Sequence, residues 1–112
     1  MNAADESVTF YKRWSLRPGV TTDAVRRFVE REILPRYAAL SPEVELGMEA
    51  EVGGLWVLAI QRWSSSEAHL RATAGPGYEA WWSEYEPHLA GWDHLVELTE
   101  AWATVPIKLR KR

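Results

Sequence analysis

Apolar and polar residues alternate along the first part of the chain, which predicts a β-strand from Ser7 to Arg17. One side of this strand is apolar and is interrupted by a single lysine, Lys12; its other members are Val8, Phe10, Trp14 and Leu16. The opposite side is polar and aromatic, with Thr9, Tyr11, Arg13 and Ser15. Pro18-Gly19 follows and is expected to end the strand.

Three further stretches have strand patterns. Residues 43–52 alternate without a break, with apolar or small residues opposite four glutamates and a glycine. Gly53-Gly54 then predicts a tight hairpin into residues 55–63. That second run is apolar on both faces, which is typical of a central strand. Alternation returns from His94 to Val105 and predicts the last strand of a sheet.

Helical patterns separate these strands. Thr21, Thr22 and Asp23 are good N-cap residues, and the helix that they predict has a buried stripe of Val25, Phe28, Val29, Ile33, Tyr37 and Leu40. Pro35 lies inside that stripe and is expected to kink or end the regular helix near Leu34. The segment 64–67 predicts a second helix start, and Gly75-Pro76-Gly77 is expected to break the short helix that follows over residues 68–73.

The segment from Gly75 to Asp93 carries three of the seven tryptophans and two of the four tyrosines. Its large residues have the spacing of an amphipathic helix that begins near Tyr78: Tyr78, Trp81, Trp82, Tyr85 and Leu89. Pro87 is expected to end or bend this helix, and Gly91 is a plausible stop. A stripe with this many large aromatic residues is expected to pack on a broad apolar surface. Two interpretations stay open: the rings form only core, or they also wall an aromatic pocket.

The element order is strand, helix, strand, strand, helix, strand. This order predicts an α+β ferredoxin-like βαββαβ fold, in which two helices cover one face of a four-stranded antiparallel sheet. The opposite face would carry Tyr11, Arg13 and a row of glutamates. This mixture favours a homodimer through that sheet face, in which Arg13 or Arg62 pairs with Glu49 or Glu97. A solvated face on a monomer is the alternative.

Bulk composition narrows the class of protein. The 112 residues predict one domain over residues 7–105, a disordered tail over 1–6 and a basic tail over 106–112. A net charge of −3 argues against nucleic-acid binding, and no apolar run is long enough for a membrane span. The chain has no cysteine, which excludes disulfides and thiolate metal sites. These features, with a polar start that does not look like a signal peptide, predict a cytoplasmic protein.

Four segments carry a resemblance to a known group: TFYKRWSLRPG, FVEREILPRY, WVLAIQRWSSSEAHL and GPGYEAWWSEYEPHL. Over about residues 7–105 the chain resembles the dimeric α+β barrel proteins, specifically the antibiotic-biosynthesis-monooxygenase-like (ABM) branch, and YKRWSLRPG is also similar to the NIPSNAP relatives. The resemblance implies a homodimer, a pocket in each subunit between sheet and helices, and oxidation of aromatic or polyketide-type substrates without flavin, metal or haem. No cofactor is therefore expected.

The candidate site combines this resemblance with the residue chemistry. We predict three catalytic residues: His69 as a general base near neutral pH, Trp63 as the aromatic that closes the third strand, and Arg13 as the cation that neutralises a phenolate. The predicted substrate-binding residues are Phe10, Trp14, Tyr78, Trp81, Trp82 and Tyr85. No histidine pair or motif has metal-ligand spacing, so no metal site is predicted.

Other functions on the same fold stay open. The chain could be a cyclase, or a non-catalytic dimeric domain that binds a small ligand or a protein. A haem-degrading relative would need an asparagine on the first strand and a histidine ligand on the second helix. Trp63 fits that pattern, but Asn2 lies in the tail and His69 lies early in the helix, so haem degradation is disfavoured.

Overall fold

Four antiparallel strands form one sheet in the computed structural model, which describes residues 6–110. The strands are β1 (Val8–Leu16), β2 (Val44–Ala50), β3 (Trp56–Trp63) and β4 (Val96–Thr104), and their order across the sheet is β2-β3-β1-β4. β1 and β3 are therefore the central strands, as the apolar pattern of residues 55–63 predicts. The predicted tail 1–6 lies almost entirely outside the described residues, as does the end of the basic tail.

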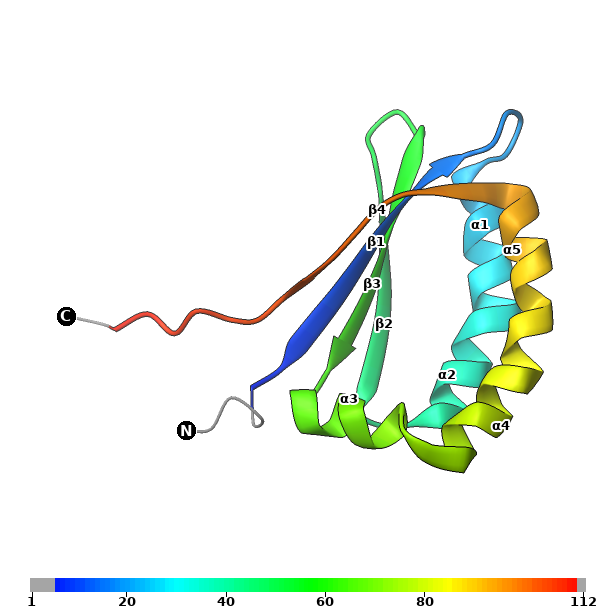
Figure 1. The fold of residues 1–112 in the computed structure, drawn as a ribbon. Helices are drawn as coiled ribbons and strands as arrows, with labels where there is room; N and C mark the ends of the chain where they lie inside the picture. The colour runs from blue at the N-terminus through cyan, green and yellow to red at the C-terminus, as the bar shows by residue number, and fades with distance from the viewer. Residues whose placement is uncertain (1–5, 111–112) are drawn as a thin grey trace.

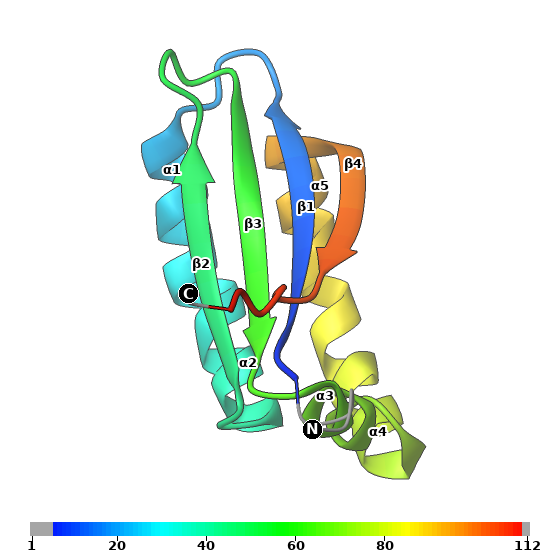
Figure 2. The ribbon, with the colours of Figure 1, turned by 90° about the vertical axis from the view of Figure 1, so that its left-hand side faces the viewer.

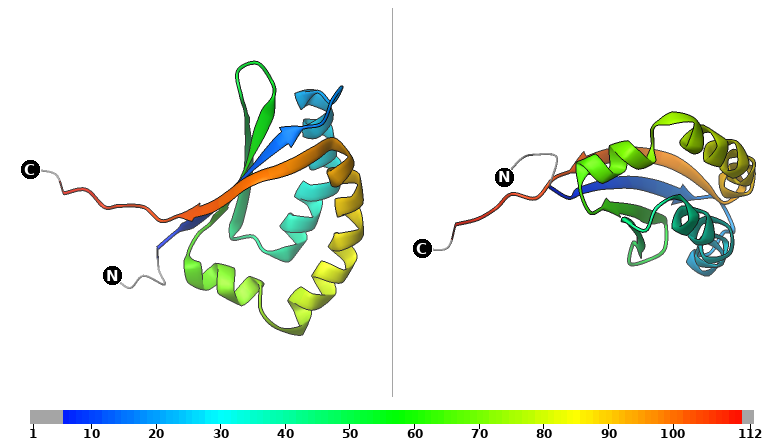
Figure 3. Two further views of the ribbon diagram at one scale, coloured as in Figure 1. Left: turned by 45° about the horizontal axis from the view of Figure 1, so that its top comes forward. Right: turned by 90° about the horizontal axis from the view of Figure 1, so that it is seen from below.

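Two helical runs lie side by side on one face of this sheet (Figures 1 and 3). The first comprises α1 (Thr22–Phe28), the π-helical segment η2 (Val29–Ile33) and α2 (Leu34–Leu40). The second comprises α4 (Gly75–Tyr85), the 3-10 turn η3 (Glu86–His88) and α5 (Leu89–Leu95), and the short helix α3 (Ser66–Ala72) leads into it from β3. The ferredoxin-like α+β fold is thus confirmed.

The predicted helix starts are real, and each has a physical cap. Thr21 Oγ1 accepts a hydrogen bond from Ala24 N at 3.1 Å, and Ser65 Oγ accepts one from Ala68 N at 3.0 Å. Pro35 disturbs the first run as predicted, but by widening the helix. Leu34 N–H donates to Val29 O, five residues back, because a proline in the next position cannot continue the regular ladder.

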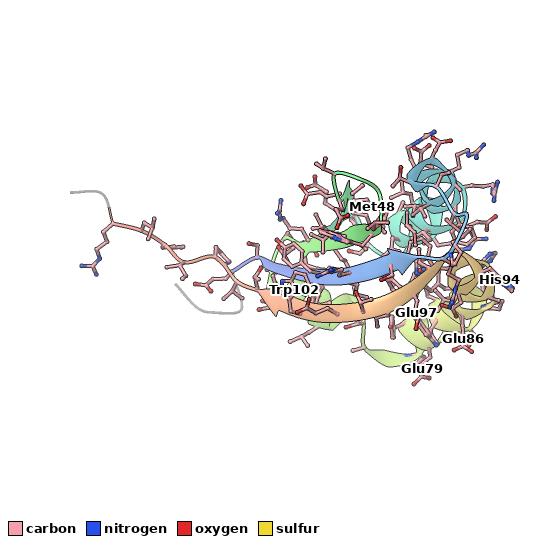
Figure 4. All side chains as sticks on the ribbon, turned by 90° about the horizontal axis from the view of Figure 1, so that it is seen from above. Met48, Glu79, Glu86, His94, Glu97 and Trp102 are labelled. Carbon is pink, nitrogen blue, oxygen red and sulfur yellow. The ribbon has the colours of Figure 1, made fainter. Side chains whose placement is uncertain are left out.

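The short helix α3 ends at Ala72, just before Gly75-Pro76-Gly77, as predicted. These three residues then form the first turn of α4, where a proline's missing N–H costs nothing, so this helix begins three residues before Tyr78. Two predictions in the second helical run are wrong. Gly91 does not stop the helix but lies inside α5. A glycine is needed there for packing, because a Cβ would stand 2.8 Å from Phe28 Cε2. His94 belongs to α5, so β4 begins at Val96; Figure 4 shows His94 beyond the Glu97 end of this strand.

Buried side chains gather in two clusters between the sheet and the helices. The larger one lies toward the α1 and α5 end and contains Val25, Val29, Val57, Trp92 and Val96. The smaller one, which we call the Trp63 corner, contains Val8, Trp63 and Ala68, with Phe10, Leu40, Val44 and Ala72 packed against it. The two clusters hold the helical layer at opposite ends of the sheet.

The other face of the sheet is bare (Figure 2). On it the Tyr11 ring stacks on Trp102 with 5.3 Å between ring centroids, and the Arg13 guanidinium lies 4.7 Å from the centroid of Trp56. Arg62 also points to this face, where its Nε donates to Thr9 Oγ1 at 3.3 Å. Among residues 6–110, Arg13 makes no ion pair with Glu49 or Glu97, so the pairing predicted for it is absent within one subunit.

Candidate functional site

A cavity of about 230 Å³ lies between the covered face of the sheet and the two helical runs. Its floor is formed by side chains of the central strands, with Phe10, Lys12 and Trp14 from β1 and Ala59 and Gln61 from β3. Its roof is formed by residues of four helical segments: Val29, Ile33, Tyr37, Trp82, Tyr85, Leu89, Trp92 and Asp93. The cavity is thus bounded by aromatic rings above and below.

The roof is held by ring contacts within α4 and between the two helical runs. Within α4, Tyr85 stacks on Trp81 with 4.7 Å between ring centroids. Between the runs, Tyr85 meets Tyr37 of α2 edge-on at 5.6 Å. Trp81 Nε1 donates to the backbone oxygen of Arg36 at 2.8 Å, which ties α4 to α2. The helical spacing of these residues on α4 brings their rings onto one side. Ring pairs of this kind add about 0.5–1.5 kcal/mol each beyond the burial of their surface.

Two tyrosine hydroxyls supply neutral polar groups to the cavity. Burial raises the pKa of Tyr37 and raises the pKa of Tyr85 further still, so both stay protonated near neutral pH. The Tyr37 hydroxyl interacts with Gln61 and with the Tyr85 hydroxyl. These groups can donate hydrogen bonds to an oxygen of a ligand, but they are unsuited to take up a proton.

Lys12 and Asp93 are the charged side chains in the cavity lining. Lys12 faces the helices because its strand alternates, which places it beside Phe10 and Trp14 and not beside Arg13. Lys12 interrupts an apolar stripe in the sequence but is not among the predicted site residues. That interruption was the available signal, because a charge in a stripe that faces a core needs a reason.

Two of the predicted catalytic residues lie together in the Trp63 corner, outside the cavity lining. The Trp63 side chain is fully buried, and its Nε1 donates to Gln61 Oε1 at 2.6 Å. His69 meets the Trp63 ring edge-on at 5.2 Å and the Phe10 ring at 4.6 Å. Burial lowers the pKa of His69, which keeps the imidazole neutral. Trp63 does not line the cavity, but it donates a hydrogen bond to Gln61, which does.

The other predicted residues divide between the cavity, its roof and the bare face. Phe10, Trp14, Trp82 and Tyr85 line the cavity, whereas Tyr78 and Trp81 stack behind it at 5.8 Å between centroids. Arg13 lies on the opposite face of the sheet and cannot reach this space. The structure therefore gathers four of the six predicted substrate-binding residues in one place and leaves the three predicted catalytic residues out of it.

A second depression of about 400 Å³ lies between α1, η2 and β2. Its charged residues satisfy one another: Arg26 donates to Glu30 at 2.9 Å and also pairs with Asp23, and this pairing lowers the pKa of Asp23. All three of these side chains are more than half exposed. A groove whose charges are already paired at the surface offers little to a ligand, so we take the aromatic cavity as the candidate site.

Between residues 6 and 110, no three histidine, aspartate or glutamate side chains come together as they would around a metal ion. No helix in that range has the length and apolar character needed to cross a membrane.

Comparison with known proteins gives structural matches only. No protein-family model and no curated protein matches the chain. SnoaB from Streptomyces nogalater, a cofactor-independent oxygenase, is 19% identical with a TM-score of 0.64, over 93% of this chain and 96% of that one. A protein of Chloroflexus aurantiacus, provisionally assigned to the antibiotic biosynthesis monooxygenases, is 16% identical with a TM-score of 0.53, over 94% and 97%.

A NIPSNAP family protein of unknown function from Agrobacterium tumefaciens also matches, at 20% identity with a TM-score of 0.57, over 95% of this chain and 93% of that one. At such identities the likeness establishes the fold. The chain has the fold of the ABM-like and NIPSNAP proteins, which confirms the resemblance at that level. Function has to be argued from the cavity itself.

Proposed function

We propose that this protein binds a small aromatic, polyketide-type substrate in the aromatic cavity and oxygenates it without a cofactor. The observation that carries this proposal is the cavity: about 230 Å³ enclosed by Phe10, Trp14, Trp82 and Tyr85, with a few polar groups among them. Apolar walls with a small number of placed polar groups are typical of small-molecule sites. The fold shared with SnoaB, a cofactor-independent oxygenase, supports the choice of reaction.

The proposed reaction balances without an added reductant. A methylene between two aromatic rings loses both hydrogens, one atom of O₂ becomes the new carbonyl oxygen, and the other atom leaves with the two hydrogens as water. The Asp93 carboxylate, which lines the cavity, would take the first proton, and the protonated Tyr37 and Tyr85 would donate hydrogen bonds to the substrate oxygen on which negative charge then develops. The aromatic walls would hold the planar substrate and keep water away from it.

The test pairs binding with O₂ consumption. Quenching of tryptophan fluorescence by anthrone should saturate, and O₂ uptake with anthrone should exceed the rate without protein. Ala59→Leu fills the cavity floor and should abolish both effects, whereas Ala80→Leu, at an exposed position of α4, should leave both unchanged. Saturable binding that Ala59→Leu does not weaken would place the ligand elsewhere and overturn the proposal.

A non-catalytic ligand-binding domain is the second candidate. It is favoured by a specific observation, since the cavity lining contains no histidine and the predicted catalytic residues Trp63, His69 and Arg13 lie outside it. The same titration separates the two functions. Saturable, Ala59-dependent binding with O₂ uptake no faster than the protein-free control, across anthrone- and naphthol-like compounds, would select this second function.

We also propose that the chain is a homodimer through the bare face of the sheet. That face presents stacked rings and the Arg13 Nε, which is buried without a hydrogen-bond partner among residues 6–110. The chain after β4 projects away from this face (Figures 1 and 2) with exposed apolar residues, including Ile107 at 84% and Leu109 at 88% exposure. Exposed apolar area of this kind marks an interaction surface.

Sedimentation of matched variants tests the dimer. Leu58 lies on the bare face of β3, where it pairs with Arg13 across the ladder, and Leu70 lies exposed on α3. Leu58→Glu should shift the protein toward a monomer, whereas Leu70→Glu should leave the sedimentation coefficient unchanged. A wild-type protein that sediments as a monomer at micromolar concentration would refute this part of the proposal.

A further inference from the structure

The position of Lys12 on the covered face of β1 is unusual for a lysine. Its neighbours across the ladder on that face are Ala59 on β3 and Ala101 on β4, two methyl side chains. Along its own strand it lies between Phe10 and Trp14, about 7 Å from each at the backbone. The small neighbours leave room around the ammonium group, and none of the four provides an opposite charge.

Two hydrogen-bond donors in this part of the cavity have no protein acceptor. Among residues 6–110, Lys12 forms no ion pair or side-chain hydrogen bond, and Asp93, which also lines the cavity, is not within ion-pair distance of it. Trp14 Nε1 is buried and has no hydrogen-bond partner in the same range. The buried Trp14 donor costs free energy while it has no acceptor, so it needs a compensating role. Lys12 is exposed to solvent at the cavity, and it places a positive charge beside that unsatisfied donor.

We propose that Lys12 and Trp14 together bind the carboxylate of an aromatic ligand, an inference that rests on the proposed use of the cavity. Both side chains leave the same face of β1 as strand neighbours and line the same space. A carboxylate has two oxygens, which matches two donors, and its aromatic body would lie against Trp82 and Tyr85. Lys12 is then the residue that makes the cavity selective for acids over neutral aromatics.

The test compares 2-naphthoate with 2-naphthamide, which has the same ring and a neutral head group. Wild-type protein should bind naphthoate about tenfold more tightly than naphthamide, as expected for one charge-assisted contact at a partly exposed lysine. Lys12→Met should remove this preference and leave naphthamide binding unchanged, and Lys12→Arg should retain part of it. Arg27→Met removes one positive charge on the exposed surface of α1 and is the matched control.

Lys12→Met should also fold as well as the wild type, because position 12 is exposed, makes no ion pair among residues 6–110, and has two alanines as its neighbours across the ladder. Its melting temperature should therefore not fall. If the wild type binds both ligands equally, or if Lys12→Met keeps the preference for naphthoate, the role of Lys12 is overturned while the aromatic cavity stands. If neither ligand binds at all, both this inference and the proposed function are overturned.

Discussion

Two tryptophans on the covered side of the sheet have opposite surroundings. Trp63, in the Trp63 corner, is fully buried among Val8, Ala68 and the His69 ring, and its indole N–H donates to Gln61. Trp82, in the cavity roof, leaves 36% of its surface exposed, and its indole N–H donates to Glu86 at the outer surface. Tryptophan is thus a fully buried core residue in one region and a partly exposed cavity-lining residue in the other.

This difference implies that, between the sheet and the helices, the Trp63 corner contributes mainly to folding stability and the cavity mainly to ligand binding. Val8, Trp63 and Ala68 in the Trp63 corner are buried among neighbouring side chains, and the Trp63 indole N–H is satisfied by Gln61. The cavity has free volume, and among residues 6–110 the buried Trp14 Nε1 that borders it has no hydrogen-bond partner. A ring that fills space contributes to the free energy of unfolding, whereas a ring that borders empty space contributes mainly when a ligand fills it.

Truncating each tryptophan to alanine is the largest test of this comparison. Trp63→Ala should lower the free energy of unfolding by about 3–5 kcal/mol, because it opens a large hole in a packed region. Trp82→Ala should lower it by about 1 kcal/mol or less, since much of this side chain already meets solvent. Urea unfolding followed by far-ultraviolet circular dichroism, at one protein concentration, measures both.

Ligand binding should give the reverse ranking in the same variants. Trp82→Ala should weaken the binding of 2-naphthoate, whereas Trp63→Phe, a milder variant that keeps the corner filled, should bind it nearly as the wild type does. Trp63→Phe also removes the donor to Gln61, so a small binding defect would report the loss of that hydrogen bond. Equal losses of stability for Trp63→Ala and Trp82→Ala would show that the corner and the wall do not differ.

The fold was readable from the sequence because strand alternation and helix caps are local properties. Residues 43–52 and the β1 stripe predicted faces that the register confirms, and Thr21 and Ser65 form the expected caps. The errors fall where a contact from another part of the chain decides. Gly91 looked like a helix stop, but its missing side chain makes room for Phe28, which lies more than sixty positions earlier.

The site was only partly readable for a related reason. The alternation pattern shows which β1 residues share a face, so it predicted Phe10 and Trp14 as lining residues. It does not show how far each aromatic ring lies from the cavity. Trp63 was predicted by resemblance, but it lies in a buried corner because Ala68 of α3 packs over it. Lys12 was visible as an exception, but only the sheet register shows that its neighbours across the ladder, Ala59 and Ala101, offer it no partner.

Adding a methyl group at two helical glycines gives the next largest expected effect. Gly91→Ala should destabilise the protein by about 1 kcal/mol net, because its Cβ would meet the Phe28 ring at 2.8 Å and that ring is held against Trp92. Gly77→Ala, in α4, has open space around it and should stabilise the protein by about 0.5–1 kcal/mol through helix propensity.

Ala59→Leu extends this comparison to the cavity floor. Three extra carbon atoms at a packed position would be costly, but at Ala59 they enter free volume, so the free energy of unfolding should change little while the cavity closes to ligands. Thermal unfolding of the three variants gives the ranking. A strong destabilisation by Ala59→Leu would mean that the cavity floor is as closely packed as the joint around Gly91.

The pH dependence of stability between pH 5 and 7 should show the smallest effect, and we assign it to His69 in the Trp63 corner. Burial lowers the pKa of His69 below the value of about 6.5 that an unfolded chain has. Between the two values the unfolded state binds the additional proton, so the free energy of unfolding falls as the pH drops below about 6.5, and the loss is complete below the lowered pKa. Above that window His69 has no effect on stability.

A His69→Gln variant isolates this contribution, because the exposed His94 and the Glu32-bound His88 remain in it. Urea unfolding of both proteins at several pH values between 5 and 7 should give a shallower slope for the variant. The ring contacts of His69 are with Phe10 and Trp63, neither of which titrates, so the lost slope can be assigned to the imidazole. Identical slopes would mean that the imidazole is as well solvated when folded as when unfolded, and the Trp63 corner would then be open to water, as the cavity is.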